Sequence, residues 1–223
     1  WRQGLKEYGI FNNCTALEKV IMPTAEEAGH FTKLNKAFEG CTALRDIDLS
    51  LLTGATDIEA AFKGTAIEKA DLSGCTSLGS TVSAFEGCAA LQEVILPSCF
   101  VPANYTFADC TGLKLIDYTA YTDTEDAPAV KNNTFSGIDD LKSVTLKVNG
   151  LNHNLFETHK IWSEFDVQYD ADGIQSVVAP TETLEVYAID GRYIGTYKST
   201  EDWSSRVPYA GIYIVNGKKV LKK

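Results

Sequence analysis

Residues 37–49 read AFEGCTALRDIDL, and the chain repeats the chemistry of this stretch several times along its length. Comparison of the copies gives the template [Ala/Thr]-Phe-x-[Gly/Asn/Asp]-Cys-[Thr/Ala]-x-Leu-x-x-[Val/Ile]-x-Leu. The Phe of the template recurs at intervals of 22 to 28 residues, at Phe11, Phe38, Phe62, Phe85, Phe107 and Phe135. A repeat of this length is one supersecondary unit that buries its apolar face only by stacking on its neighbours.

The two halves of the template predict different parts of each repeat. In Leu-x-x-[Val/Ile]-x-Leu, the fourth and sixth residues lie on the same side of a short strand, because strand side chains alternate between faces. The Phe and the first Leu come from a connecting arc and close the repeat around a shared core. We therefore predict one continuous interior row of aromatic rings that contains Phe38, Phe62, Phe85 and Phe107.

Repeat length and strand pattern together predict a leucine-rich repeat architecture. The expected fold is α/β and β-rich, with a right-handed solenoid of about six coils over residues 1–168. The third repeat, from Phe62 to Ile67, lacks the Cys and is one residue short. Residues 74–78, GCTSL, copy the middle of the template but precede small polar residues, so we interpret them as an insertion.

The last part of the chain, residues 169–223, has a different pattern. Strand-like residues flank an Asp190-Gly191 dipeptide, and a second pair of strand-like segments, 211–215 and 218–221, flanks Asn216-Gly217. Each pattern predicts a β-hairpin. We expect a small antiparallel β-sandwich-like domain. A terminal cap on the solenoid is the alternative, since solenoids need their ends covered.

Charge and hydropathy exclude several classes of partner. The 223 residues carry a formal net charge of −10 with a pI near 4.8, which argues against nucleic acid as a partner. No apolar run approaches the length of a membrane-spanning helix. The chain opens on Trp1 without a leader pattern, so a signal peptide either was removed or never existed. We expect a monomer.

The six cysteines follow the repeat. Four of them, Cys14, Cys41, Cys88 and Cys110, come three residues after the repeat Phe, where a small apolar side chain packs inward. Free Cys behaves as a small, buried hydrophobic residue, so we favour thiols over disulfides. The chain contains no CxxC motif, which leaves zinc ribbons and thioredoxin-type chemistry without support.

No constellation of residues predicts catalysis or a cofactor. The three histidines are scattered, and the chain has no phosphate-binding, nucleophile-elbow or zinc-protease motif. Residues 170–173, DADG, resemble the start of a calcium loop but lack the later oxygen ligands, so a turn is favoured. We expect no enzyme activity, no cofactor and no metal.

The outward side of the stacked strands is the most informative surface. Its two predicted columns are Lys19, Asp46, Lys69, Glu93, Leu115 and Ser143, and Ile21, Asp48, Asp71, Ile95, Asp117 and Thr145. Adjacent strands lie about 4.8 Å apart, so Asp48 and Asp71 should be neighbours, with Lys69 as the local counter-charge. The candidate ligand-binding residues are Asp46, Asp48, Asp71, Ile95, Leu115 and Asp117. They would form a recognition face for a basic or amphipathic partner, or weakly hold a cation. The alternative is an ordinary solvated face, because exposed charges contribute little.

Residues 84–97, AFEGCAALQEVILP, resemble the mark of the BspA-like leucine-rich repeat family, Ala-Phe-x-Gly-Cys-x-x-Leu-x-x-Ile-x-Leu-Pro. The resemblance covers residues 10–165 and includes Trp162-x-x-Phe165 as an aromatic closing turn. It implies a secreted or surface-displayed bacterial protein used for adhesion. Residues 189–192, IDGR, and 211–220, GIYIVNGKKV, resemble a C-terminal sorting-type domain of secreted proteins from the same bacteria, which implies export.

The expected function is therefore that of a non-enzymatic, exported recognition protein. It would bind a protein on a host or bacterial surface through the solenoid face. One alternative is a glycan-binding accessory protein that uses exposed aromatic residues such as Tyr118, Tyr121 and Trp203. Another is a structural spacer whose C-terminal domain mediates surface attachment.

Overall fold

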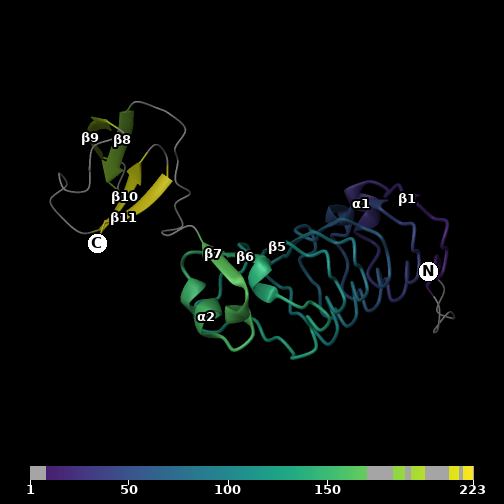
Figure 1. The fold of residues 1–223 in the computed structure, drawn as a ribbon. Coiled ribbons are helices and arrows are strands. Elements are labelled where there is room, and N and C mark those ends of the chain that lie inside the picture. Colours follow the sequence, from purple (N-terminus) through teal and green to yellow (C-terminus); the bar gives the residue numbers. More distant parts are fainter. Residues whose placement is uncertain (1–8, 170–182, 189–191, 199–210, 216–217, 223) are drawn as a thin grey trace. The chain divides into compact units, whose positions relative to one another are not determined.

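The computed structural model describes residues 9–169, 183–188, 192–198, 211–215 and 218–222. The chain divides into two compact units, Trp1–Gln168 and Tyr169–Lys223. We call the first the repeat unit and the second the C-terminal unit. In the repeat unit, successive repeats stack in sequence order, from the purple to the green part of the ribbon (Figure 1).

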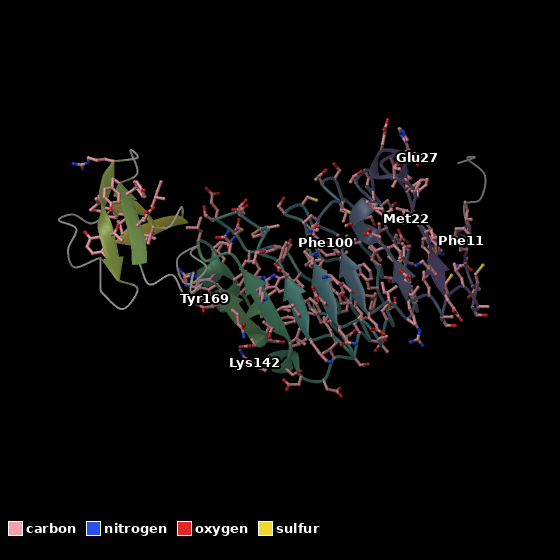
Figure 2. The ribbon with its side chains drawn as sticks, turned by 90° about the horizontal axis from the view of Figure 1, so that it is seen from above. Phe11, Met22, Glu27, Phe100, Lys142 and Tyr169 are labelled. Carbon is pink, nitrogen blue, oxygen red and sulfur yellow. The ribbon has the colours of Figure 1, made fainter. Side chains whose placement is uncertain are left out.

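Each repeat contributes one short strand to the same face of the repeat unit, as Figure 2 shows from Phe11 at one end towards Lys142. The strands are β1 (Lys19–Val20), β2 (Asp46–Ile47), β3 (Lys69–Asp71), β4 (Glu93–Ile95), β5 (Leu115–Asp117), β6 (Thr145–Val148) and β7 (Asp166–Tyr169). They form two sheets, β1-β2 and β3-β4-β5-β6-β7. The pairs β1–β2, β3–β4, β4–β5 and β5–β6 are parallel.

Short helical segments join the strands. They are α1 (Ala25–Ala28), η1 (Leu49–Leu51), η2 (Leu141–Ser143), α2 (His153–Thr158) and η3 (Trp162–Glu164), where η marks a 3-10 helix. None exceeds six residues, so the repeat unit is built mainly from strands and turns. The β-rich character predicted from the sequence is confirmed.

The predicted interior row of aromatic rings is confirmed. From Phe11 to Phe135, each repeat ring stacks on the next with centroids 5.4–5.7 Å apart and planes within 13° of parallel. Phe62, Phe85 and Phe107 are fully buried. Aromatic pairs at this distance add to the free energy gained from their burial, so the row forms the axis of the core.

The Gly, Asn or Asp of the template marks a turn. The residue two places after each repeat Phe has a positive φ of 58–80°, at Asn13, Gly40, Gly64, Gly87, Asp109 and Gly137. This left-handed conformation suits Gly, Asn and Asp, which explains the template. Four residues two places before the Phe are also left-handed, at Lys36, Ala60, Ser83 and Tyr105, although their side chains give no sequence signal.

Backbone hydrogen bonds join these turns from repeat to repeat. The Ala60 N–H donates to the Val82 carbonyl over 2.9 Å, and the Gly64 N–H donates to the Glu86 carbonyl over 2.8 Å. The Phe62 N–H donates to the Ala84 carbonyl between them, over 3.0 Å. The connecting arc therefore has its own ladder, separate from the strand ladder.

Thiols line the core beside the aromatic row. Cys41, Cys75, Cys88 and Cys110 are buried, and the Cys88 thiol donates to the Phe62 carbonyl of the preceding repeat over 2.9 Å. Burial, together with a smaller effect of Cys99, raises the pKa of Cys75 to about 12. Cys14 differs from its predicted inward position and is exposed, because its repeat lies at the end of the described stack.

The stretch interpreted as an insertion belongs to the core instead. Cys75 is fully buried and Leu78 is 6% exposed. Ser80 then forms a parallel bridge to Asp57, which in turn bridges to Lys33. Residues 74–80 therefore build the return arm of the third repeat, because its apolar side chains fill positions between neighbouring repeats.

Aromatic residues cover the last repeat of the repeat unit. Trp162 and Phe165 are fully buried, and the Phe165 ring lies 4.9 Å from that of Phe135. The Trp162 indole N–H donates to the Pro128 carbonyl over 2.8 Å. The predicted aromatic closing turn is confirmed at these residues.

The C-terminal unit contains one described sheet. Its strands are β8 (Thr183–Ala188), β9 (Tyr193–Lys198), β10 (Gly211–Val215) and β11 (Lys218–Lys222), in the antiparallel order β11-β10-β8-β9. Val186, Tyr213 and Val215 form its buried cluster. Both predicted hairpins appear as antiparallel pairs. Their Asp-Gly and Asn-Gly turns lie outside the described residues, and the second layer of the predicted sandwich stays a prediction.

Candidate functional site

The strand register places most of the predicted outward columns correctly. Lys69 pairs with Glu93 and Glu93 with Leu115 in one column, and Asp71 pairs with Ile95 and Ile95 with Asp117 in the other. Ile95, Leu115 and Asp117 are half-buried, whereas Asp46 and Asp48 are exposed. Alternate residues of the strands, such as Val94 and Ile116, point into the core and are fully buried.

The predicted columns are wrong at the sixth strand. Leu115 pairs with Thr145 and Asp117 pairs with Lys147, not with Ser143 and Thr145. The sixth repeat has extra residues between Phe135 and its strand, and the 3-10 helix η2 occupies Leu141–Ser143. The strand therefore starts later than the template predicts, and the second column gains a lysine.

The counter-charge prediction for Lys69 is also wrong. Its ammonium pairs with Glu93 over 2.8 Å, and the hydrogen bond from Lys69 to this carboxylate is the main reason why the Lys69 pKa is raised. Asp71 and Asp117 add smaller effects in the same direction. At the previous junction, Lys19 pairs with Asp46 over 2.5 Å. Opposite charges on directly paired residues stabilise the ladder, which explains why each lysine contacts the carboxylate opposite it on the next strand.

The aspartates of the second column each hold the turn that follows their strand. Asp71 Oδ1 accepts from the Ser73 N–H over 3.0 Å and from the Ser73 hydroxyl over 2.6 Å. Asp48 and Ser50 make the same two contacts, as do Asp117 and Thr119. The motif Asp-x-[Ser/Thr] after the strand is the sequence signal of this turn, and our sequence analysis missed it.

The sheet is interrupted between β2 and β3, which belong to different sheets. A cavity of about 430 Å³ opens there, and its lining comes from the ends of the second and third repeats. We call it the β2/β3 cleft, lined by Arg45, Asp46, Ile47, Asp48, Leu49, Glu68, Lys69 and Asp71. Asp46, Asp48 and Asp71 of the predicted site meet in the cleft. Ile95, Leu115 and Asp117 lie on the paired strands and do not line it.

The shortened third arc accounts for the interruption. The strand begins eight residues after Phe38 but only seven after Phe62. As a result, the Ala66 N–H donates to the Leu44 carbonyl over 3.0 Å. At the next junction the corresponding bond runs from the Gln92 N–H to the Glu68 carbonyl, directly before the strands. The loss of one residue therefore shifts the backbone hydrogen-bond partners between the two repeats. As a result, β2 and β3 do not pair with each other.

The cleft has an apolar base and a charged rim. Leu49 is 1% exposed and Ile47 is half-buried. The rim carries four carboxylates, of Asp46, Asp48, Glu68 and Asp71, against the cations of Arg45 and Lys69. Lys69 is paired with Glu93 and Asp46 with Lys19, so three carboxylates remain against Arg45 and the charge of the cleft is negative.

A family model described as the BspA-type leucine-rich repeat region, with six copies, matches residues 7–126 and 59–177. This chain belongs to that family. The match covers the repeat unit from residue 7 onward and extends a few residues beyond it, so the BspA-type repeats account for the stacked strands and the aromatic row. No curated protein and no solved structure matches the chain.

Within the described ranges, no three His, Cys, Asp or Glu residues are placed to hold a metal ion together. No described helix is both long and apolar enough to cross a membrane. The calcium-loop resemblance at residues 170–173 lies outside the described residues.

The predicted aromatic glycan site is not formed as expected. Tyr118 is fully buried in the repeat unit, and its hydroxyl donates to the Phe100 carbonyl. Burial raises the pKa of Tyr118 above its ordinary range. Tyr121 is half-buried beside it, with rings 5.2 Å apart, and Trp203 lies outside the described residues. Tyr118 therefore belongs to the core, because its ring fills the space next to Phe156 and Trp162.

Proposed function

We propose that this protein is a non-enzymatic, exported recognition protein that binds a protein on a host or bacterial surface. The proposed binding surface is the outer strand face, defined as the outward side chains of β2 to β5. The observation that carries the proposal is the continuous register of β3, β4 and β5 within this face, which sets Ile95 and Leu115 beside Asp71 and Asp117. Apolar contacts surrounded by charges are typical of protein interfaces.

Two further points support binding over catalysis. Membership of the BspA-type family agrees with a surface role in protein interaction. Stacked repeats also provide an extended open surface, whereas catalysis needs an enclosed set of polar groups. The proposal includes the finer architecture expected from the sequence: a right-handed solenoid of about six coils, a β-sandwich-like C-terminal domain, export and a monomeric state.

A binding screen with matched variants tests the proposal. The protein is applied to a panel of extracellular-matrix proteins and, in parallel, to a glycan array. We expect a protein ligand, and the double variant Ile95→Ser, Leu115→Ser should weaken its binding about tenfold or more, as is usual for central apolar interface residues. Val101→Ser is the control, because Val101 is 50% exposed and lies outside the strands.

The outcomes separate the candidate functions. If both variants bind as tightly as the unchanged protein, the outer strand face is not the binding surface. Binding to glycans alone would favour the glycan-binding alternative, although the burial of Tyr118 removes one of its expected residues. Deletion of residues 174–223 tests the spacer alternative, which predicts that surface attachment is then lost.

A further inference from the structure

We propose that the β2/β3 cleft receives a lysine or arginine side chain projected by the protein partner. The inference rests on the proposed function and adds to it a specific position and a specific chemistry. It starts from the interruption of the sheet. The repeat pairs on either side, β1–β2 and β3–β4, are joined by a parallel ladder, whereas β2 and β3 are not.

The unpaired strand edges provide polar groups for a ligand. Backbone N–H and C=O groups of a strand normally bond to a neighbouring strand. At the β2/β3 cleft, the facing edges of the two strands have no such ladder between them. A polar head group that enters the cleft therefore meets backbone acceptors as well as side-chain carboxylates.

The second and third repeats remain joined on both sides of the cleft, which limits what can enter. Before the strands, the Ala66 N–H bonds to the Leu44 carbonyl. After the strands, a Cβ added to Gly74 would lie 2.1 Å from the Ser50 carbonyl oxygen, so the backbones of the two repeats are in close contact there. An inserted strand would need the repeats about 9–10 Å apart, twice the normal strand spacing. A single side chain fits this arrangement better than a strand.

The chemistry of the cleft suits a long basic side chain. Such a side chain has an aliphatic stem, which can lie on the half-buried Ile47, and a cationic head, which can reach the rim. The carboxylates of Asp48, Glu68 and Asp71 at the rim take part in no ion pair in the described structure.

Small probes test the cleft without knowledge of the partner. The full chain, isotope-labelled, is titrated with N-acetyl-arginine methylamide, N-acetyl-lysine methylamide and the uncharged N-acetyl-norleucine methylamide, and followed by two-dimensional NMR. We expect saturable shifts for the two basic probes at residues 45–49 and 66–71, and weaker binding at higher salt. No saturable shift, or equal shifts with the uncharged probe, would overturn the inference.

Matched variants then show which carboxylates of the cleft bind the basic probes. Asp48→Asn and Asp71→Asn keep the oxygen that accepts the turn hydrogen bonds, and each should weaken the basic probes about threefold to fivefold, as expected for one solvent-screened ion pair. Asp140→Asn is the control, because the Asp140 carboxylate accepts from the Lys142 N–H in a comparable turn outside the cleft and its loss should leave binding unchanged. Equal effects of all three variants would indicate a general charge effect and overturn the inference.

The two proposals fail separately. If the probes do not bind, the cleft inference is wrong, whereas the strand-face proposal still depends on the partner screen with the Ile95 and Leu115 variant. If the probes bind in the cleft but no protein ligand is found, the cleft is a basic-side-chain site and the proposed function is wrong.

Discussion

The junction between β2 and β3 and the junction between β4 and β5 follow the same template but differ in their outer layer. Inside, they are nearly identical: the Phe38 and Phe62 rings stack at 5.7 Å, and the Phe85 and Phe107 rings stack at 5.6 Å. Outside, β4 and β5 pair along three residues, whereas β2 and β3 do not pair. The core of a repeat is therefore less sensitive to arc length than its strand ladder.

The arc explains this difference in sensitivity. At the interrupted junction, the Phe38 and Gly40 N–H groups still donate to the carbonyls of Ala61 and Lys63, both over 2.8 Å. These bonds lie before the missing residue, so the deletion does not affect them. The strand lies after it and is shifted by one position, which reverses side-chain direction unless the backbone adjusts. The backbone adjusts by giving up the ladder, because the buried side chains Ile67 and Ala70 keep their place in the core.

The largest expected effect tests whether both junctions share one core. Phe62→Ala and Phe85→Ala should each lower the free energy of unfolding by about 3–5 kcal/mol, because each removes a fully buried ring from the row. Urea unfolding measures both values. Thr111→Ala, at an exposed position, should stay within about 0.5 kcal/mol of the unchanged protein. A loss below about 1 kcal/mol for Phe62→Ala alone would place the third repeat outside the common core.

A one-residue insertion should remove the difference between the junctions. One Cys inserted between Gly64 and Thr65 gives the third arc the length of the second, so β2 and β3 should pair and the cleft should close. Two or three new hydrogen bonds would stabilise the protein by about 1–3 kcal/mol. Hydrogen exchange should slow for amides in residues 45–49 and 67–71.

The matched control for this insertion is one residue added between Ala89 and Ala90. It lengthens an arc that already fits, so it should accelerate exchange in β4 and destabilise the protein. Unchanged exchange around the cleft in the first insertion would contradict our explanation, because the interruption would then have a cause other than arc length.

A smaller effect on stability is expected at the turn aspartates of the two junctions, Asp48 and Asp117. Asp48→Ala and Asp117→Ala each remove an acceptor for a backbone N–H and a hydroxyl, and each should cost about 0.5–2 kcal/mol, as for other capping side chains. The turn is local, so the two costs should agree despite the different strand pairing. Urea unfolding of both variants checks this. A cost confined to Asp117→Ala would show that the turn depends on an intact ladder.

The smallest effect concerns an ion pair across an intact junction. Lys63 Nζ lies 2.8 Å from Glu86 Oε1. Burial alone would raise the pKa of Glu86, but hydrogen bonds from Lys63 and Ser83 outweigh it and hold the pKa below its ordinary value of 4.5. A lowered folded-state pKa stabilises the protein above pH 4.5, and this contribution is lost as the pH falls through the folded-state value.

Glu86→Gln should therefore cost less than about 1 kcal/mol at neutral pH and nothing at strongly acidic pH. Urea unfolding over this pH range measures the difference between the variant and the unchanged protein. A difference that does not change with pH would mean that Glu86 acts through packing and not through its charge.

The sequence predicted the stacked aromatic row and the closing turn at Trp162 and Phe165 because each depends on residues within one repeat. The left-handed turn after each Phe was implied by the Gly, Asn or Asp of the template, since few other residues adopt that conformation at low cost. The acidic column was also correct at Asp71 and Asp117. Its turn-holding role was readable from the motif Asp-x-[Ser/Thr], which we did not use.

The tertiary structure decided how neighbouring repeats meet. The short third arc was visible in the sequence, but its consequence, the β2/β3 cleft, depended on which backbone partner Ala66 found in the preceding repeat. The late start of the sixth strand and the burial of Tyr118 were likewise set by contacts between repeats. A template describes one repeat at a time, whereas strand pairing and surface exposure are properties of two repeats in contact, because hydrogen bonds and buried area belong to the pair.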